Sequence, residues 1–159
     1  MMRRAGAALA VLLCATAVRA DEPPPAAYPA GASAFQANCA VCHGPAGAGV
    51  PSLAPPLTSY PARYAANAEG RRQLAMTVLY GLFGDIAVEG RHYASRMPDF
   101  GQLDDATLAA VLNFVVFDLA HAPAAVTPLA AGELAGERAH PADGAAVREH
   151  RKSLAPADP

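Results

Sequence analysis

An all-α fold is predicted by three features of the sequence. Between residues 104 and 119, the apolar side chains recur at helical spacing: Leu108, Val111, Leu112, Val115 and Leu119. No stretch shows sustained alternation of apolar and polar residues between hairpin turns, so a sheet is not expected. Residues 44–61 are interrupted repeatedly by Gly and Pro, which predicts an irregular loop. The 159-residue length suits one domain of short helices and loops.

The first twenty residues have the features of a secretory signal peptide. Arg3 and Arg4 precede a short apolar run, and Val18-Arg19-Ala20 supplies a small-residue cleavage site. The run is too short for a comfortable membrane span. We therefore expect cleavage after Ala20, a periplasmic location and no stable insertion in a membrane.

Cleavage would change both the charge and the thiol content of the chain. Loss of three arginines moves the formal net charge from −2 to −5, and loss of Cys14 leaves two cysteines, Cys39 and Cys42. With one lysine and an acidic balance, nucleic acid is not an expected partner.

The remaining chain divides into three parts. Residues 21–30 form a Pro/Ala-rich lead-in, residues 31–121 form the predicted domain, and residues 122–159 form a C-terminal extension. Within the domain we expect a helix capped by Ser33, a second helix over residues 69–80 and a last helix capped by Asp104 or Asp105. Residues 84–103 are expected to form a loop.

The C-terminal extension is predicted to form two short helices wrapped on the core, with a disordered tail as the alternative. Thr127 can cap the first helix with Pro128 at its first position, and Asp143 can cap the second.

The domain has about ninety residues, much of them loop, so its own apolar side chains give a small core. This predicts that another group fills the interior. The candidate attachment point is Cys39-x-x-Cys42-His43. A thioredoxin-type dithiol needs a βαβ setting, a zinc site needs a second pair of ligands, and a disulfide would close a very small ring. The sequence shows neither a βαβ pattern nor a second pair of zinc ligands.

The C-x-x-C-H motif favours covalent attachment of one c-type haem. Two thiols at this spacing can add to the two vinyl groups on one edge of the porphyrin, and the next imidazole can bind the iron. The candidates for the sixth ligand are Met76, Met97, His92, His121, His140 and His150. Pro98 keeps Met97 out of helical geometry, as suits a ligand in a loop. Met76 lies at an apolar helical position, and His92 and the three histidines from residue 121 onward are expected to be exposed. We therefore expect Met97 to be the ligand.

Residues 31–120 resemble the small, soluble, single-haem cytochromes c of bacteria (class I). The resemblance rests on Gly31-x-x-x-Phe35-x-x-x-Cys39, on the Pro-Leu turn in "LAPPLT", and on Tyr93-x-x-x-Met97-Pro98 followed by an amphipathic helix. Ala94-Ser95 departs from the Asn-Gly that this family often has after the tyrosine. The resemblance implies a cytochrome c fold of three to four core helices around one covalent haem.

The same resemblance implies roles for further residues. Gly31 would let the first and last helices cross closely, and Phe114 would be the aromatic partner of Phe35 on the last helix. Pro56, with Pro55 as the alternate, would accept a hydrogen bond from the proximal imidazole. Tyr93 would be a haem-pocket aromatic.

The function expected from these residues is periplasmic electron transfer without catalysis, between a dehydrogenase or other donor and an oxidase or cytochrome acceptor. Two alternatives remain: a cytochrome subunit fixed to a periplasmic dehydrogenase through the terminal segments, and an open-site haem enzyme or sensor. The second is disfavoured if Met97 saturates the iron, and no second C-x-x-C-H suggests a multihaem peroxidase.

Overall fold

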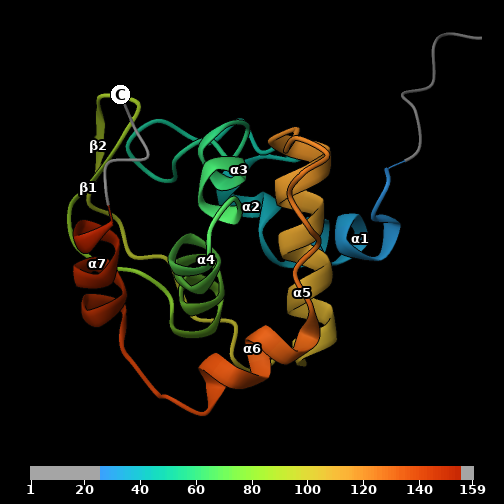
Figure 1. Ribbon diagram of the computed structural model, residues 1–159. Helices are drawn as coiled ribbons and strands as arrows, with labels where there is room; N and C mark the ends of the chain where they lie inside the picture. The colour runs from blue at the N-terminus through green and yellow to red at the C-terminus, as the bar shows by residue number, and fades with distance from the viewer. Residues whose placement is uncertain (1–25, 155–159) are drawn as a thin grey trace, which may run out of the picture.

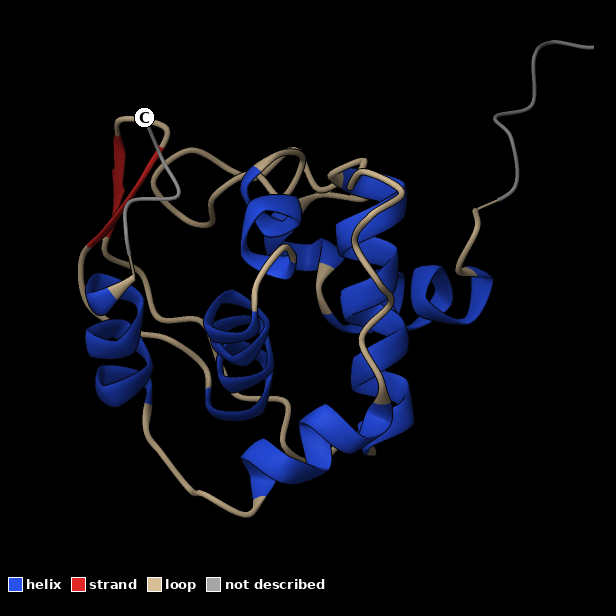
Figure 2. Ribbon diagram, in the orientation of Figure 1, coloured by secondary structure: helices blue, strands red, loops and turns tan. Residues whose placement is uncertain are grey.

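The computed structural model describes residues 26–154, so the predicted signal peptide and residues 21–25 of the lead-in lie outside the described part. Helices dominate this part, in agreement with the predicted all-α class (Figures 1 and 2). Its elements, in chain order, are α1 (Pro29–Asn38), α2 (Ala40–His43), α3 (Tyr60–Ala65), α4 (Ala68–Tyr80), β1 (Ile86–Val88), β2 (Arg91–Tyr93), α5 (Asp105–Asn113), the π-helix η1 (Phe114–Leu119), α6 (Ala131–Arg138) and α7 (Gly144–Ser153).

Helices α1 and α5 cross at close range. A Cβ on Gly31 would lie 2.0 Å from the carbonyl oxygen of Ala110, so only glycine fits at this crossing. The Phe35 and Phe114 rings pack beside it with their centroids 5.3 Å apart. The expected glycine contact and aromatic pair are both present.

The start of α1 differs from the sequence prediction. The helix begins at Pro29, and Ser33 lies inside it with its hydroxyl donating to the Pro29 carbonyl. Asp118 of η1 accepts hydrogen bonds from the backbone N–H groups of Ala27 and Tyr28. A carboxylate from the other end of the domain thus satisfies donors just before the helix, where a local cap was expected.

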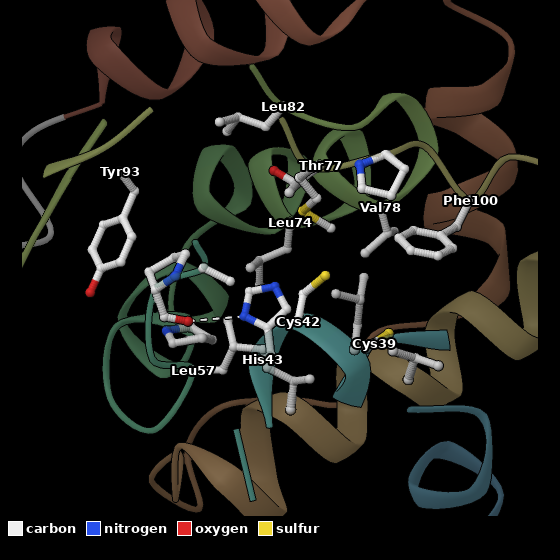
Figure 3. A pocket seen from close by; sticks show the side chains of 18 of the residues that line it. Cys39, Cys42, His43, Leu57, Leu74, Thr77, Val78, Leu82, Tyr93 and Phe100 are labelled. Atoms are coloured by element: carbon white, nitrogen blue, oxygen red, sulfur yellow. Dashed lines mark hydrogen bonds between the residues drawn. The ribbon is translucent and has the colours of Figure 1, made fainter. Parts of the chain in front are cut away.

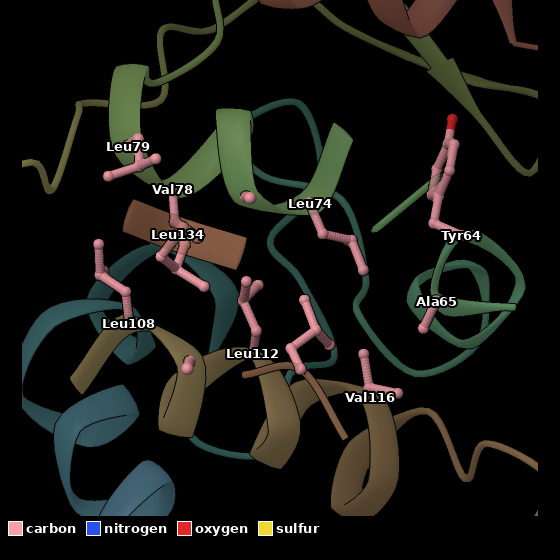
Figure 4. Close-up of a cluster of buried hydrophobic side chains, with 12 residues drawn as sticks. Tyr64, Ala65, Leu74, Val78, Leu79, Leu108, Leu112, Val116 and Leu134 are labelled. Atoms are coloured by element: carbon pink, nitrogen blue, oxygen red, sulfur yellow. The ribbon is translucent and has the colours of Figure 1, made fainter. Parts of the chain in front are cut away.

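The main apolar cluster lies between α4, α5 and α6 (Figure 4). Asn67 caps α4 by accepting from the Gly70 N–H, and Asp104 caps α5 by accepting from the Thr107 N–H. Each cap satisfies one of the free N–H groups at the start of its helix. The largest buried aliphatic members of the cluster are Leu74, Val78, Leu79, Leu108, Leu112, Val116, Leu129 and Leu134.

The predicted loop over residues 84–103 contains a short antiparallel hairpin, so the expectation of no sheet was wrong at this point. Ile86 pairs with Tyr93 and Val88 with Arg91. The two turn residues, Glu89 and Gly90, both have positive φ, as a two-residue type I′ hairpin turn requires. Each strand has only three residues, which is too short for alternation to be recognised.

The C-terminal extension forms two helices packed against α4 and α5 (Figure 1). Helix α6 begins at Ala131 and not at the predicted Thr127-Pro128 start, while Asp143 caps α7 as expected. Leu134 of α6 and Val147 of α7 are fully buried. Among the described residues, no helix is both long enough and apolar enough to cross a membrane.

Candidate functional site

A deep pocket opens between α2, α4, α5 and the loops that precede α3 and α5 (Figure 3). Its volume is about 1310 Å³, including the space at its mouth. Most of its lining is apolar, with side chains such as Leu74, Val78, Phe100 and Val111. A mostly apolar lining with a few polar groups is typical of a ligand-binding pocket.

Cys39, Cys42 and His43 lie on one helical turn along one wall of the pocket. The N–H groups of Cys42 and His43 both donate to the Cys39 carbonyl, at 3.1 and 3.0 Å. This turn brings two free thiols and an imidazole to the same cavity. Figure 3 shows the Cys42 and His43 side chains next to each other in it.

Burial affects the acid–base chemistry of this turn. It raises the pKa of the Cys39 thiol to about 11, with a smaller contribution from the neighbouring Cys42. Burial also lowers the pKa of His43, opposed by a hydrogen bond to the Pro55 carbonyl. At neutral pH the imidazole is therefore neutral, which is the form that binds a metal ion.

The partner of His43 is Pro55, and not Pro56 as preferred from the sequence. The His43 Nδ1 atom lies 2.9 Å from the Pro55 carbonyl oxygen. An N–H donated there from Nδ1 leaves Nε2 as the acceptor nitrogen. Pro55 lines the pocket beside the imidazole, so the carbonyl that orients the ring belongs to the first proline of the pair.

Met97 also lines the pocket and is held by backbone contacts with the end of α4. It exchanges two hydrogen bonds with Leu82, from Leu82 N–H to Met97 O at 3.1 Å and from Met97 N–H to Leu82 O at 2.8 Å. A Cβ on Gly81 would lie 2.5 Å from the Met97 carbonyl oxygen, so this approach depends on glycine. Met76 is not among the pocket-lining residues and is buried with Leu82 and Val147 in a cluster against which Met97 also packs, as expected for core packing.

Of the remaining candidates, the aromatic residue lines the pocket and the histidines do not. Tyr93 is buried and lines the pocket. His92 is exposed and paired with Asp85, and His121 and His140 are exposed. The exposed position expected for His150 was wrong: this side chain is 14% exposed and contacts Gln73 and Glu69.

Several polar residues of the lining were not found from the sequence, among them Gln73, Thr77 and Arg151. Gln73 and Thr77 lie one turn apart on α4 and bond to each other, with Gln73 Nε2 donating to Thr77 Oγ1. Arg151 reaches the pocket from α7, near the end of the chain. No local motif marks Arg151, because only the packing of the extension brings it to the site.

The residues present fit a covalently attached haem. The pocket combines two thiols, a neutral imidazole and a thioether with apolar walls suited to a porphyrin face. Within residues 26–154, the His, Cys, Asp and Glu side chains form no group of three or more that could hold a metal ion by themselves. A histidine together with a methionine is a ligand pair known for haem iron.

Comparison with known proteins agrees with this fit. The family model described as "Cytochrome c" matches residues 28–116, which is more than half of the chain. Two proteins named cytochrome c-552, one from Thermus thermophilus and one from a particular strain of the same species, are each 44% identical over 79 residues. These matches cover 50% of this chain and 60% and 53% of the relatives, so the chain spans little more than half of their length.

Proposed function

Because the chain belongs to the cytochrome c family, we propose that it carries single electrons between redox proteins. It is a class I cytochrome c with a covalently bound haem c. The haem supplies an iron that cycles between the ferric and ferrous states. One observation carries the proposal: the thiols and imidazole of residues 39–43 line the same apolar pocket as the Met97 thioether.

Cys39 and Cys42 attach the haem in this proposal, and His43 is the proximal ligand. The turn that places both thiols on one wall suits two thioether bonds to one porphyrin edge. The Pro55 carbonyl holds the Nδ1–H of His43, so Nε2 is directed to the metal and the ring cannot rotate freely.

Met97 is the distal ligand. Its backbone pairing with Leu82 and the close approach of Gly81 hold the loop in place without any bond to iron. A thioether favours ferrous iron more than a second nitrogen donor does, and burial also favours the lower charge. If His43 and Met97 both bind the iron, no position would be left open for a substrate, which supports a carrier over an enzyme.

The mouth of the pocket is suited to brief protein contacts. Val41 is 83% exposed and Leu53 is 44% exposed, and both line the opening. An apolar patch at an exposed cofactor edge can form the small, weak interface that redox encounters use. The patch around Val41 and Leu53 is therefore the proposed contact with donor and acceptor proteins in the periplasm.

A free shuttle is favoured over a fixed subunit of a dehydrogenase. The subunit alternative assigned the C-terminal extension to docking on another protein. In the structure, α6 and α7 pack back on the domain, with Leu134 and Val147 fully buried there. This packing occupies the apolar faces that a docking segment would offer.

The experiment that tests the proposal is the near-infrared spectrum of the oxidised protein. Methionine–ferric ligation gives a weak charge-transfer band there, and we expect this band in the wild type. Met97→Ala should remove the band, lower the reduction potential and allow carbon monoxide to bind the reduced form.

Met76→Leu is the matched control because it changes the other methionine of the described domain at constant volume. It should keep the band and cost under about 1.5 kcal/mol. A wild type that lacks the band and binds carbon monoxide rapidly would overturn the carrier proposal in favour of an open-site enzyme or sensor.

A further inference from the structure

A chain of hydrogen bonds connects the surface of the protein with the wall of the pocket. It begins at the exposed carboxylate of Glu69, whose Oε2 atom lies 3.2 Å from His150 Nε2. The Nδ1 atom of the same imidazole lies 2.7 Å from Gln73 Oε1. Gln73 Nε2 then donates to Thr77 Oγ1 at 3.0 Å. Both Gln73 and Thr77 line the pocket, so the chain links a surface group to the proposed haem site.

The inner part of this chain is buried and has a defined orientation. Gln73 is 2% exposed, and Figure 3 shows Thr77 on the α4 side of the pocket, apart from the wall that carries Cys42. The Thr77 hydroxyl donates to the Gln73 backbone carbonyl at 2.7 Å, so it can only accept from the Gln73 amide. The amide nitrogen therefore faces Thr77, and the amide oxygen faces His150. The C-terminal extension supplies this last group, because α7 packs on α4 (Figure 1).

The two partners of His150 are both hydrogen-bond acceptors. The Gln73 amide oxygen and the ionised Glu69 carboxylate have no hydrogen to donate, whereas a neutral imidazole has one N–H and an imidazolium has two. The arrangement therefore favours the imidazolium, which donates from Nδ1 to Gln73 and from Nε2 to Glu69. Loss of the Nε2 proton would leave a lone pair facing the carboxylate. This chain of contacts thus responds to a single proton.

We propose that His150, with Gln73 as the connecting group, couples a proton on the C-terminal extension to the redox state of the haem. The proposal rests on electron transfer by a haem in this pocket, as given under the proposed function. Reduction removes one positive charge from the iron and protonation adds one to His150, so each change favours the other. Charges interact more strongly in a protein interior than in water, and the buried amide lies between the imidazole and the pocket.

The coupling is reciprocal because it is a linkage between two binding equilibria. Protonated His150 raises the reduction potential, and His150 holds its proton more tightly when the iron is ferrous. Between the titrations of the two redox states, one electron from the donor protein reduces the iron and one proton from solvent binds His150 Nε2. Transfer of the electron to the acceptor protein returns the proton. Histidine ordinarily titrates between about pH 5 and pH 8, so this range is accessible to the protein.

The other ionisable groups on elements near α7 are accounted for as follows. Arg71 and Arg72 of α4 pair with Glu133 and Glu137 of α6, Glu149 pairs with Arg148 and Lys152, Arg151 lies over Tyr60 and Tyr64 of α3, which also carries Arg63, and Asp85 pairs with His92 at the hairpin. Arginine and lysine ordinarily stay charged, and tyrosine neutral, from about pH 5 to pH 8. The competing sources of a pH dependence are therefore His92 and the haem carboxylates.

The test is spectroelectrochemical titration of the holoprotein from about pH 4 to about pH 9. The wild-type potential should be constant at acid pH, fall between two inflections and then be constant again, with the ferric inflection at the lower pH. His150→Gln should remove this fall and give the alkaline wild-type potential throughout. His92→Gln is the matched control, an exposed histidine that should keep both inflections.

Two further measurements separate coupling from packing. Glu69→Gln changes an exposed side chain and should move both inflections to lower pH, because the carboxylate favours the imidazolium. The NMR resonances of the His150 imidazole should titrate at a higher pH in the ferrous than in the ferric holoprotein. A purely structural role of His150 would change neither the inflections nor these midpoints.

The same pH dependence in wild type and His150→Gln would overturn the proposal and assign the titration to another group, such as a haem carboxylate. Equal NMR midpoints of His150 in the two redox states would also overturn it, as would loss of the fall in His92→Gln. Should His150→Gln fail to fold, unchanged inflections in Glu69→Gln would overturn it instead. In each case a covalent haem in the wild type would leave electron transfer standing, whereas absence of covalent haem would remove both proposals.

Discussion

The domain of residues 28–116 and the C-terminal extension are stabilised in different ways. The domain surrounds a large pocket, and the proposed ligand residues lie on a single helical turn and on a loop. The extension contributes Arg151 to the lining of this pocket. It is held by a few fully buried apolar side chains, such as Leu134 and Val147, and by several polar anchors to the domain.

Three sets of hydrogen bonds anchor the extension to the domain. Arg71 of α4 binds both carboxylate oxygens of Glu133 at 2.7 Å, and also the Thr127 and Pro128 carbonyls. The buried amide of Asn113 both donates to and accepts from the backbone of Leu129. Arg138 pairs with Asp105 and donates to the Gly101 and Leu103 carbonyls, which precede α5. Each anchor satisfies backbone groups that lie outside regular secondary structure.

The comparison separates two kinds of stability. The core of the domain is incomplete without the haem, whereas the extension is packed by the polypeptide alone. Changes at the cysteines should therefore remove the holoprotein, and changes in the extension should lower its stability while the haem stays attached. The predictions below test this separation, from the largest expected effect to the smallest.

Loss of either thiol of the motif should have the largest effect. Cys39→Ala or Cys42→Ala should leave little stable holoprotein, because the haem supplies much of the core of this small domain. The measurement is the haem absorbance that remains with the protein after acid–acetone extraction. Cys14→Ala, in the predicted signal peptide, is the control and should retain full absorbance. Removal of the haem from the wild type by the same extraction would contradict covalent attachment.

Truncation of the buried leucine of α6 should destabilise the holoprotein and leave its haem in place. Leu134 is 0% exposed, so Leu134→Ala should cost about 2–5 kcal/mol of the free energy of unfolding. Leu134→Met nearly keeps the volume and should cost under about 1.5 kcal/mol. Denaturant titration measures both values. Loss of haem absorbance from Leu134→Ala after export would show that haem attachment depends on the packing of the extension.

A glycine from each region should respond with opposite sign to the same substitution. Gly31→Ala places a methyl group 2.0 Å from the Ala110 carbonyl oxygen and should cost about 1–3 kcal/mol. Gly136 lies in α6, and a Cβ there meets no described atom within 4 Å. Gly136→Ala should stabilise the protein by about 0.5–1 kcal/mol through helix propensity. Equal melting temperatures for the two variants would contradict the crossing geometry.

Much of the domain could be predicted because its signals are local. The spacing of Leu108, Leu112 and Val115 defines the last helix, and a motif of five residues marks the wall with the thiols. Placement of Met97 in a loop followed from Pro98. These features depend on covalent geometry and periodicity, which a sequence displays directly.

The features that were missed depend on contacts between distant segments. Helix α6 starts later than predicted because Arg71 binds the Thr127 and Pro128 carbonyls and keeps that stretch outside the helix. Asp118, remote in sequence, occupies the donors that precede α1. Whether Pro55 or Pro56 accepts the hydrogen bond from His43 depends on the path of the loop past the imidazole. Arg151 joins the site only because α7 folds back beside the hairpin.

The smallest expected effect is the pH dependence of the anchor at Glu133. Its pKa is lowered mainly by the hydrogen bonds from Arg71, against an opposing effect of burial. A carboxyl whose pKa is lower in the folded state stabilises the fold fully above its unfolded pKa, about 4.3, and the contribution is lost as pH falls through the folded value. Because the side chain is 37% exposed, this contribution should be under about 1 kcal/mol at neutral pH. Glu133→Gln should therefore be less stable than the wild type at pH 7, and the difference should shrink toward zero well below about pH 4.

The control is Glu149→Gln, whose carboxylate pairs with Lys152 on the surface of α7 and contacts no other helix through that pair. A stability difference for Glu133→Gln that stayed constant from neutral to acid pH would show that the charge of this anchor does not stabilise the extension.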